Sequence, residues 1–370
     1  MIGKAKDIGF RKMKLIKRLL SLVMCFVMTA TLVTGCGSAP VQDTATGTSS
    51  AVETSASETS IETEQTTTEP EPWFTFQPKV CSSFHEGILG KAMCDSWYSL
   101  VDAVLAGEDT FSCPNGHVYF WMIAEFPKVC FPVMSEIIEI PNDLNFAEIN
   151  GTGKIHYKVS KEEAARKIAE FQVLVEEIIN EVMRPEYSDF ENALALYSYF
   201  THTYTYDYDT FYKIENNEPV NYTSSYRLLT TKTGICCEIS EAYSYLLLQV
   251  GIDAATVMTS KHEWSLIKLN GNYYHIDPTF GVEDKDNLSF FMMTDKQRKD
   301  TYFYDDKNFN YVAFYNPEFV PDYSAKDDTF KVLWDYHMTS FDHETKNISC
   351  WKYAGEGQES FTFDYGSVSK

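Results

Sequence analysis

The 370-residue chain is poor in basic residues, and this shortage excludes one class of partner. It holds 31 Lys and Arg against 53 Asp and Glu, a formal net charge of −22 at pH 7. Nucleic-acid binding draws most of its affinity from cations that neutralise phosphates, so no nucleic acid is expected as a ligand. The acidity instead favours solubility at a crowded surface and attracts any amine-bearing substrate.

The apolar run near the N-terminus is too short to span a membrane. Seven basic residues between Lys4 and Arg18 precede it, and the run itself covers only the 15 residues Leu19–Val33. A spanning helix needs about 20 apolar residues. A basic start followed by a short apolar segment is typical of an export signal. Without those seven basic residues and Asp7, the chain has 24 basic and 52 acidic residues, a net charge of −28.

The leader ends in Val33-Thr34-Gly35-Cys36, which resembles a bacterial lipobox. That resemblance implies a signal peptide over residues 1–36, lipid attachment at Cys36, and an anchored protein on the extracellular face of the bacterial cell membrane. An ordinary cleaved signal and a membrane-spanning helix are the alternatives. Residues 37–72 lack large apolar side chains almost entirely, so we expect a disordered linker rich in Ser, Thr and Glu.

Metal-site spacing and internal repeats are also missing. No cysteine pair has zinc-finger spacing, and most histidines are scattered, so neither a metal nor another cofactor is expected. Seven cysteines remain once Cys25 and Cys36 of the leader are set aside. Four of them can form two disulfides in an exported protein, with three possible connectivities. These four are Cys81, Cys94, Cys113 and Cys130.

Cys236 and Cys237 begin a helical pattern. The apolar residues that follow recur at the spacing of a helix with one buried face, and Gly251 ends the pattern. Thr231 and Thr233 are the expected N-caps, which places Cys236 in the first turn. Unpaired N–H groups and the positive end of the helix dipole favour a thiolate there, the nucleophilic form of cysteine.

A β-hairpin is predicted next, because Asn270-Gly271 lies between two β-rich runs. The register pairs Leu269 with Asn272, Ile267 with Tyr274, Ser265 with Ile276, and Trp264 with Asp277. This register puts His262, Trp264 and Asp277 on one face. Diagonal neighbours lie roughly 7 to 8 Å apart at the backbone, so the Asp277 carboxylate can reach the His262 imidazole.

Cys236, His262 and Asp277 have the chemistry of a nucleophile, its base and the group that orients the base. Contact between the helix start and the hairpin face is an assumption at this stage. The alternative is a structural role for Cys236 and Cys237, as a buried pair or a bond between neighbours.

Three segments carry a family resemblance: Gly234-Ile235-Cys236, His262-Glu263-Trp264-Ser265 and Asp277-Pro278-Thr279-Phe280. In order and spacing they resemble the core of the transglutaminase-like superfamily, a papain-like Cys-His-Asp fold common in bacterial surface proteins. The resemblance covers roughly residues 189–295. It implies an α+β fold in which the cysteine helix packs on an antiparallel sheet, and catalytic roles for Cys236, His262 and Asp277.

Three positions depart from the family pattern, and one of them is Ile239, which stands where an aromatic residue is usual. Glu238 stands where a glycine is usual, and we expect its charge to raise the pKa of the nearby thiol and to oppose the helix dipole. Arg227 stands where a glycine commonly follows the upstream aromatic residue, Tyr226. Supporting roles are predicted for Cys237 and for Tyr226, which either donates a hydrogen bond near the site or simply packs in the core.

Trp264 is expected to cover the His262–Asp277 pair and to exclude water. His275 shares the hairpin, but an isolated histidine has no required partner. We interpret it as a residue that the sheet simply accommodates, with support of the catalytic pair as the alternative.

The remaining segments give a coarse domain plan. Periodicity predicts helices at 92–105, 161–183 and 191–199, short strands at 118–123 and 155–159, and a buried segment at 288–294. The plan is an N-terminal mixed flank at 73–188, a transglutaminase-like core at 189–300 and a C-terminal β-rich extension at 301–370.

The predicted reaction is acyl transfer from an amide through a thioester on Cys236. Hydrolysis is favoured over cross-linking, because bulk water competes with any amine. The expected substrate is a protein or a cell-wall peptide, and the protein is expected to be a monomer. One alternative is an inactive or weak transglutaminase-like surface protein that serves as a binding or scaffold module, which Glu238 and the aromatic content favour. A solute-binding lipoprotein would need two similar lobes, and one core is recognisable.

Overall fold

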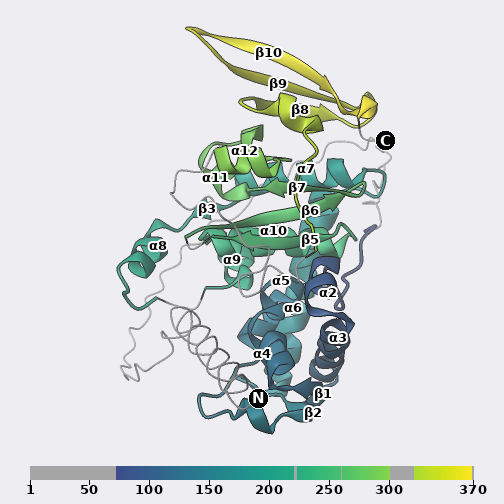
Figure 1. The fold of residues 1–370 in the computed structure, drawn as a ribbon, viewed down its shortest axis with the longest axis vertical. Helices are drawn as coiled ribbons and strands as arrows, with labels where there is room; N and C mark the ends of the chain where they lie inside the picture. Colours follow the sequence, from purple (N-terminus) through teal and green to yellow (C-terminus); the bar gives the residue numbers. More distant parts are fainter. Residues whose placement is uncertain (1–71, 221–222, 260, 301–320, 369–370) are drawn as a thin grey trace, which may run out of the picture. The chain divides into compact units, whose positions relative to one another are not determined.

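The structure, a computed structural model, describes residues 72–220, 223–259, 261–300 and 321–368 (Figure 1). The predicted lipidation site Cys36, nearly all of the predicted linker and residues 301–320 of the predicted extension lie outside these ranges. The described residues from Trp73 onward belong to one unit. Within it, no helix combines the length and the apolar composition needed to cross a membrane.

The helices and strands carry the labels of Figure 1. The α-helices are α2 (Ser83–Leu89), α3 (Lys91–Leu105), α4 (Gly116–Ala124), α5 (Phe126–Cys130), α6 (Lys161–Val182), α7 (Asp189–Thr203), α8 (Tyr208–Glu215), α9 (Ser225–Thr231), α10 (Cys236–Gln249), α11 (Pro278–Glu283) and α12 (Asp295–Asp300). The strands are β1 (Thr110–Asn115), β2 (Asn150–Lys154), β3 (Thr205–Tyr206), β4 (Thr233–Gly234), β5 (Ala254–Met258), β6 (Glu263–Leu269), β7 (Asn272–Ile276), β8 (His337–Asp342), β9 (Asn347–Ala354) and β10 (Gly357–Asp364).

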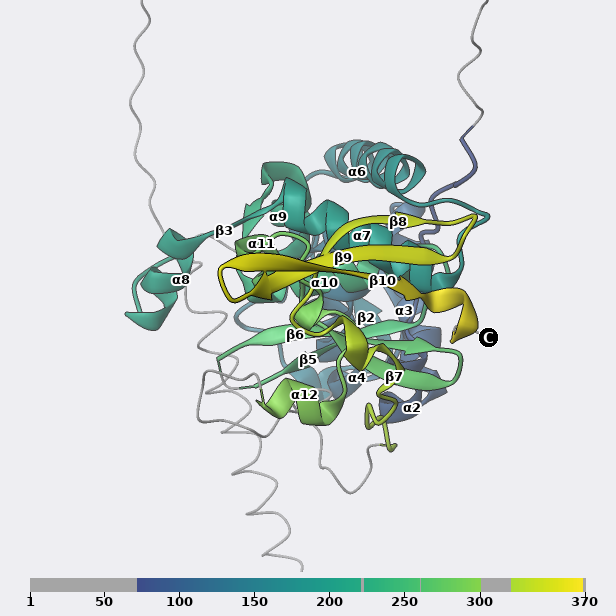
Figure 2. The same cartoon turned by 90° about the horizontal axis from the view of Figure 1, so that it is seen from above.

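Helix α10 packs on an antiparallel sheet with strand order β5-β6-β7. Its predicted apolar face is buried, with Ile239, Tyr243 and Leu246 inaccessible to solvent. The register of β6 and β7 is the predicted one from Leu269↔Asn272 to Ser265↔Ile276. Figure 2 shows these strands side by side with α12 next to them, and α12 contacts β7. The α+β fold class and its antiparallel core sheet are confirmed.

The predicted helices of the flank and core are confirmed as α3, α6 and α7, and side chains cap the starts of the last two. The hydroxyl of Ser160 accepts from the Glu163 N–H before α6, and a reciprocal Ser188–Glu191 pair begins α7. Each cap satisfies backbone donors that the first turn of a helix leaves unpaired.

Two predicted strands of the flank are wrong. Residues 118–123 lie in helix α4, which Asn115 begins by accepting from the Val118 N–H at 3.1 Å. The helix is apolar on most sides and buried, and a short apolar run looks the same in a strand as in a buried helix. In 155–159, a segment that the structure describes completely, Tyr157 forms an isolated bridge to Ile138 and no strand is present.

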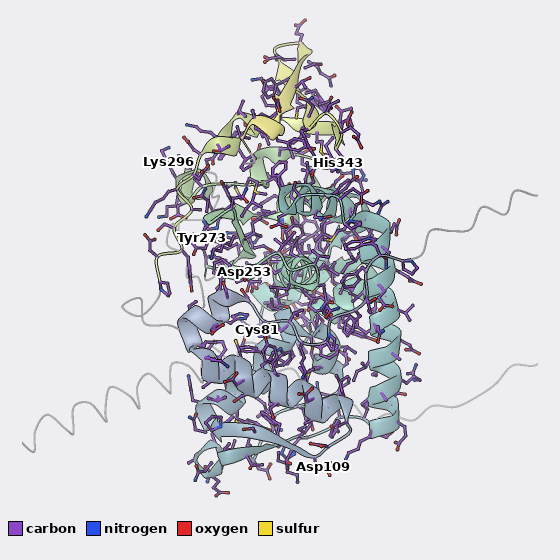
Figure 3. The ribbon with its side chains drawn as sticks, turned by 90° about the vertical axis from the view of Figure 1, so that its right-hand side faces the viewer. Cys81, Asp109, Asp253, Tyr273, Lys296 and His343 are labelled. Atoms are coloured by element: carbon purple, nitrogen blue, oxygen red, sulfur yellow. The ribbon has the colours of Figure 1, made fainter. Side chains whose placement is uncertain are left out.

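The flank is joined to the core sheet by polar contacts at its first helix. Ser82 caps α2, and the Asp253 carboxylate before β5 accepts from the Ser82 hydroxyl at 2.8 Å and from the Ser83 N–H at 2.9 Å. Figure 3 labels Asp253 near Cys81, the residue that precedes this cap. The flank therefore packs with the core sheet as one unit.

The described cysteines are all thiols, so no disulfide is present among them. The Cys81 thiol hydrogen-bonds with those of Cys94 and Cys130. The Cys113 thiol instead donates to the Asn115 carbonyl at 3.4 Å. The expectation of two disulfides stays a prediction. Because the Cys81 thiol contacts those of both Cys94 and Cys130, Cys81 is favoured as one of the bridging residues.

The described part of the C-terminal region forms a separate antiparallel sheet, β10-β9-β8, drawn in yellow in Figure 1. Its anchor is Glu191 of α7, which is buried and accepts hydrogen bonds from the Tyr365 hydroxyl at 2.6 Å and from Lys346 at 3.1 Å. These partners compensate for the cost of burying a carboxylate.

Candidate active site

Cys236 is the first residue of α10 and remains partly exposed. The prediction that it lies in the first turn is confirmed. The predicted caps are wrong, because Thr231 ends α9 and Thr233 belongs to β4, so the N-cap position falls on Ile235. Ile235 has no polar side chain to offer, and the start of the helix is held instead by the Glu238 carboxylate, which accepts from the Ile235 N–H at 2.9 Å.

His262 and Asp277 lie at the open ends of the β6–β7 hairpin and meet there. The His262 Nε2 lies 2.8 Å from the Asp277 Oδ2, and both side chains are buried. Thr259 fixes the histidine backbone by accepting from its N–H at 3.2 Å. The predicted diagonal contact is confirmed.

The thiol of Cys236 also reaches His262, so the helix start does meet the hairpin face. Because Nε2 faces Asp277, Nδ1 is the ring nitrogen that faces the thiol. Burial opposes the charge on His262, but the charge and hydrogen bond of Asp277 and the hydrogen bond with Cys236 outweigh it and raise the pKa of His262 to about 9. At neutral pH the imidazole is therefore cationic beside the thiol.

Aromatic rings enclose the histidine. Trp264 stacks on His262 with ring centroids 5.8 Å apart, as predicted, and Phe280 contacts the same ring at 5.3 Å. Trp264 is completely buried. A low-dielectric cover of this kind strengthens the electrostatic interactions beneath it.

His275 holds Trp264 in place, which the sequence interpretation of a merely accommodated residue did not foresee. The Trp264 indole N–H donates to the His275 Nδ1 at 3.0 Å, and the His275 Nε2 lies 2.9 Å from the Asp295 Oδ1. The first bond requires an unprotonated Nδ1, so the ring is neutral and donates from Nε2. Burial agrees with this assignment because it lowers the pKa of His275.

Sequence reasoning missed Arg298. Its Nη2 lies 2.9 Å from the Asp277 Oδ2, and its guanidinium carbon sits 4.2 Å from the centroid of the Trp264 ring. Only 1% of Arg298 is exposed. The short polar segment Asp295–Asp300 looks like a solvated surface helix in the sequence, so no local signal marks this arginine.

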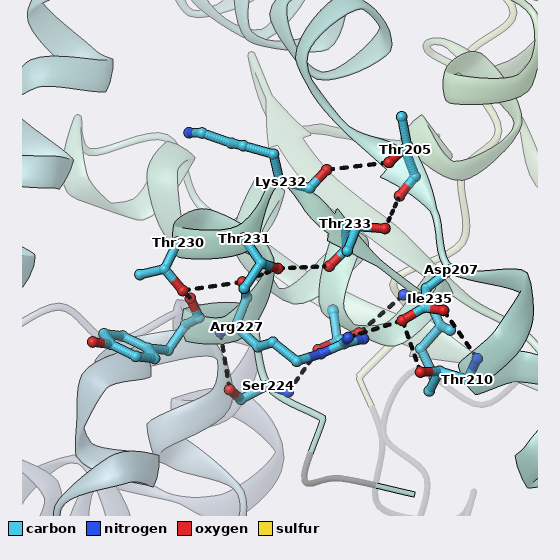
Figure 4. Close-up of polar contacts among 12 residues, drawn as sticks. Thr205, Asp207, Thr210, Ser224, Arg227, Thr230, Thr231, Lys232, Thr233 and Ile235 are labelled. Atoms are coloured by element: carbon cyan, nitrogen blue, oxygen red, sulfur yellow. Dashed lines mark hydrogen bonds and ion pairs between the residues drawn. The ribbon is translucent and has the colours of Figure 1, made fainter. Parts of the chain in front are cut away.

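Two of the departures from the family pattern, Glu238 and Arg227, are partners of each other. Figure 4 shows Arg227 near Ser224, Asp207 and Ile235. The Glu238 carboxylate is buried and accepts from the Arg227 Nε at 2.8 Å and from the Ser224 N–H at 2.8 Å. Arg227 also binds the Asp207 carboxylate at 2.9 Å. The Glu238 charge is therefore balanced by Arg227, and the carboxylate caps the Ile235 N–H. The expectation that this charge opposes thiolate formation at Cys236 loses its basis.

Gly234 of the Gly-Ile-Cys segment makes room for this cap. A Cβ at Gly234 would lie 2.8 Å from the Leu228 Cδ1 and 2.9 Å from the Glu238 Oε2. Any larger residue would push the carboxylate away from the helix start.

Cys237 and Tyr226, two predicted supporting residues, have different surroundings. Cys237 is buried, and its pKa is raised by that burial and by Glu241. The Tyr226 ring packs on Phe171 with centroids 5.8 Å apart and lies under the Lys167 ammonium. These contacts correspond to the packing alternative for Tyr226.

No group of three or more His, Cys, Asp or Glu side chains in the described ranges could hold a metal ion.

Residues 176–283 match the family model of the transglutaminase-like superfamily. The matched segment is therefore similar to a transglutaminase-like core. The match begins inside α6, before the predicted start at 189, and it includes Cys236, His262 and Asp277.

Two solved structures are similar to parts of the chain. One is described as a "Putative Cysteine Protease from Cytophaga hutchinsonii", with 17% identity and a TM-score of 0.23, over 30% of this chain and 37% of that one. The other is described as a "TGase", with 13% identity and a TM-score of 0.28, over 49% of this chain and 53% of that one. This chain thus spans about a third to a half of those proteins. No match was found among curated proteins.

Proposed function

We propose that this protein is an exported, lipid-anchored cysteine enzyme that acts on amide bonds through a thioester. The observation that carries the proposal is the Cys236–His262–Asp277 arrangement at the start of α10. A nucleophile, a base and an orienting carboxylate in contact are the elements of nucleophilic acyl transfer.

The thiolate of Cys236 attacks the amide carbonyl and forms a tetrahedral oxyanion. The first N–H groups of a helix have no partners within it. The Ile235 N–H is taken by Glu238, which leaves the N–H groups of Cys236 and Cys237 to face the oxyanion. The His262 imidazolium then gives its proton to the departing amine, and a thioester on Cys236 remains.

Release of the acyl group regenerates the thiol. His262, held in one tautomer by Asp277, takes a proton from water or from an amine that attacks the thioester. We assign water as the usual acceptor, because Cys236 is partly exposed and bulk water competes with amines. The acyl donor is a protein or a cell-wall peptide, which suits an acidic protein carried outside the membrane by its leader.

The inactive-scaffold alternative loses its main support. It drew on Glu238 as an unfavourable charge near the thiol, and Arg227 neutralises that charge. We therefore retain the enzyme as the proposed function.

The test uses p-nitrophenyl acetate as an acyl donor for the purified full-length protein. We expect a burst of p-nitrophenolate and a mass increase of one acetyl group, mapped to Cys236. Added hydroxylamine would then attack the acetyl thioester and release acetohydroxamate. The ratio of acetohydroxamate to acetate would measure whether the thioester prefers an amine or water as acceptor. Equal acetylation of Cys236 and of a denatured control would contradict the proposal.

A further inference from the structure

The Asp277 carboxylate serves two cations through one oxygen. Its Oδ2 lies 2.8 Å from the His262 Nε2 and 2.9 Å from the Arg298 Nη2. Asp277 is fully buried, and Arg298 is nearly so. A buried arginine is retained only with a compensating partner, and here that partner is the residue that orients the catalytic base.

The guanidinium is fixed in this position from two further directions. It lies against the Trp264 ring at 4.2 Å and near the Phe280 ring at 5.8 Å, the same two rings that enclose His262. Arg298 and His262 are thus two cations in one aromatic enclosure, with Asp277 between them. The geometry is that of a shared counter-ion in a buried site.

Sharing has a chemical consequence for the histidine. An imidazole paired with a carboxylate of its own holds its proton tightly, and a tightly held proton is transferred slowly to a departing amine. An arginine on the same carboxylate oxygen draws part of that charge to itself. The ion pair of Cys236 and His262 also becomes electrically balanced, because Asp277 and Arg298 cancel each other.

We propose that Arg298 is a positioning residue that takes up part of the Asp277 charge and thereby keeps the His262 imidazolium acidic enough to protonate an amine leaving group. The inference rests on the proposed function and deepens it. It assigns the site to substrates with poor leaving groups, amides in preference to esters.

The titratable and charged groups around His262 are few. Cys236 faces it from α10, Asp277 from the end of β7, and Arg298 from α12 through Asp277. Tyr197 of α7 senses the Asp277 charge, but its hydroxyl donates to the Asn287 carbonyl at 2.6 Å, so it does not compete for the carboxylate. Removal of Arg298 therefore takes one positive charge away from the Asp277 carboxylate and leaves that carboxylate paired with His262.

Helix α12 supports the same site a second time. Its first residue, Asp295, holds His275, which holds the Trp264 indole. The Asp295 Oδ1 also accepts from the Ala325 N–H at 2.9 Å, which ties the helix to the chain that follows. One short helix therefore sets both the charge on Asp277 and the ring that covers His262.

The experiment compares Arg298→Gln, Arg298→Lys and the control Lys296→Gln in the full-length protein. Lys296 is exposed on the same helix and pairs with Asp300, so its replacement removes one positive charge without touching Asp277. Each variant is assayed with a p-nitrophenyl ester and with the p-nitroanilide of the same acyl group. The p-nitrophenolate released from the ester is a weak base and leaves with little protonation. The amine released from the anilide must receive a proton from His262 before it can leave.

We expect Arg298→Gln to lose at least about threefold more activity on the anilide than on the ester. Arg298→Lys should recover most of this difference, and Lys296→Gln should show none. In a Cys236→Ala background, NMR titration should show the His262 pKa rising by about one unit in Arg298→Gln. Equal losses on both substrates, or an unchanged His262 pKa, would overturn the inference. If the unmodified protein attacks neither substrate, the proposed function fails, and the NMR titration still decides the role of Arg298.

Discussion

Two adjacent cysteines at the start of α10 have opposite environments. Cys236 is partly exposed and contacts His262, which is cationic at neutral pH. Cys237 is buried and faces the carboxyl groups of Glu241 and Glu263. Both share the N-terminal turn and its dipole, so the dipole does not distinguish them. The side chains that face each thiol determine which one is a nucleophile.

The contrast extends to the charges around each thiol. Near Cys236, Asp277 meets both His262 and Arg298, and Glu238 of the same helix turn meets Arg227. On the Cys237 side, burial raises the pKa of Glu263 to about 7, which favours its neutral form. A reactive thiol needs paired charges of the kind found near Cys236, whereas the buried surroundings of Cys237 favour an unreactive thiol.

The largest expected effect separates the two thiols directly. Cys236→Ala should reduce acetylation by p-nitrophenyl acetate by about a thousandfold or more, because no nucleophile remains. Cys237→Ala should stay within about threefold of the unmodified protein. Intact mass spectrometry measures both, and similar losses in the two variants would break the comparison.

The second test removes the neutralising partner of Glu238. Arg227→Met should destabilise the fold by about 3 to 5 kcal/mol, because a buried carboxylate loses its countercharge. Arg166→Met is the control, since Arg166 is more than half exposed and surface ion pairs of this kind contribute little to stability. Urea unfolding gives both values. Similar small losses would show that Glu238 does not depend on Arg227.

The third test uses pH to separate the two sides. Folding raises the pKa of Glu263 from 4.5 to about 7, so its contribution to stability is complete below pH 4.5 and is lost as the pH rises through 7. Folding raises the pKa of His262 from 6.5 to about 9, so its contribution is complete below pH 6.5 and is lost as the pH rises through 9.

Each contribution amounts to at most about 3 to 4 kcal/mol. Glu263→Gln should flatten the decline in unfolding free energy between pH 4.5 and 7. His262→Gln should flatten the decline between pH 6.5 and 9. Urea unfolding at a series of pH values measures both slopes. Unchanged slopes in the two variants would assign the pH dependence to other groups.

The smallest effect concerns the cover of the Cys236 side. Trp264→Phe keeps an aromatic ring over His262 but removes the hydrogen bond to His275, which should cost about 1 to 2 kcal/mol. Thermal unfolding would show the loss. The variant His275→Phe should cost more than Trp264→Phe, because it also removes the bond to Asp295. A loss in His275→Phe no larger than that in Trp264→Phe would show that the bond to Asp295 contributes nothing to stability.

The sequence predicted what local geometry controls. Asn270-Gly271 fixes a two-residue turn, and the register then brings His262 to Asp277 without further information. The helix after Cys236 followed in the same way from its apolar spacing and from Gly251.

The sequence did not predict what distant segments supply. Arg298 lies in a polar six-residue helix, and only the tertiary fold brings it to Asp277. The Arg227–Glu238 pair was visible as two unusual residues, but nothing in their spacing showed that they meet. Helix α4 was mistaken for a strand because a run buried on most sides has no periodicity to read.

The most direct test of the account is the rate of iodoacetamide alkylation against pH, resolved to Cys236 and Cys237 by peptide fragmentation, in the unmodified protein and in His262→Ala. We predict that Cys236 is alkylated in acidic solution, where an ordinary thiol is protonated and unreactive, that His262→Ala abolishes this reactivity, and that Cys237 stays unreactive in both proteins. Alkylation of Cys236 that needs alkaline solution in both proteins would contradict the account, and a faster reaction at Cys237 would reverse the assignment.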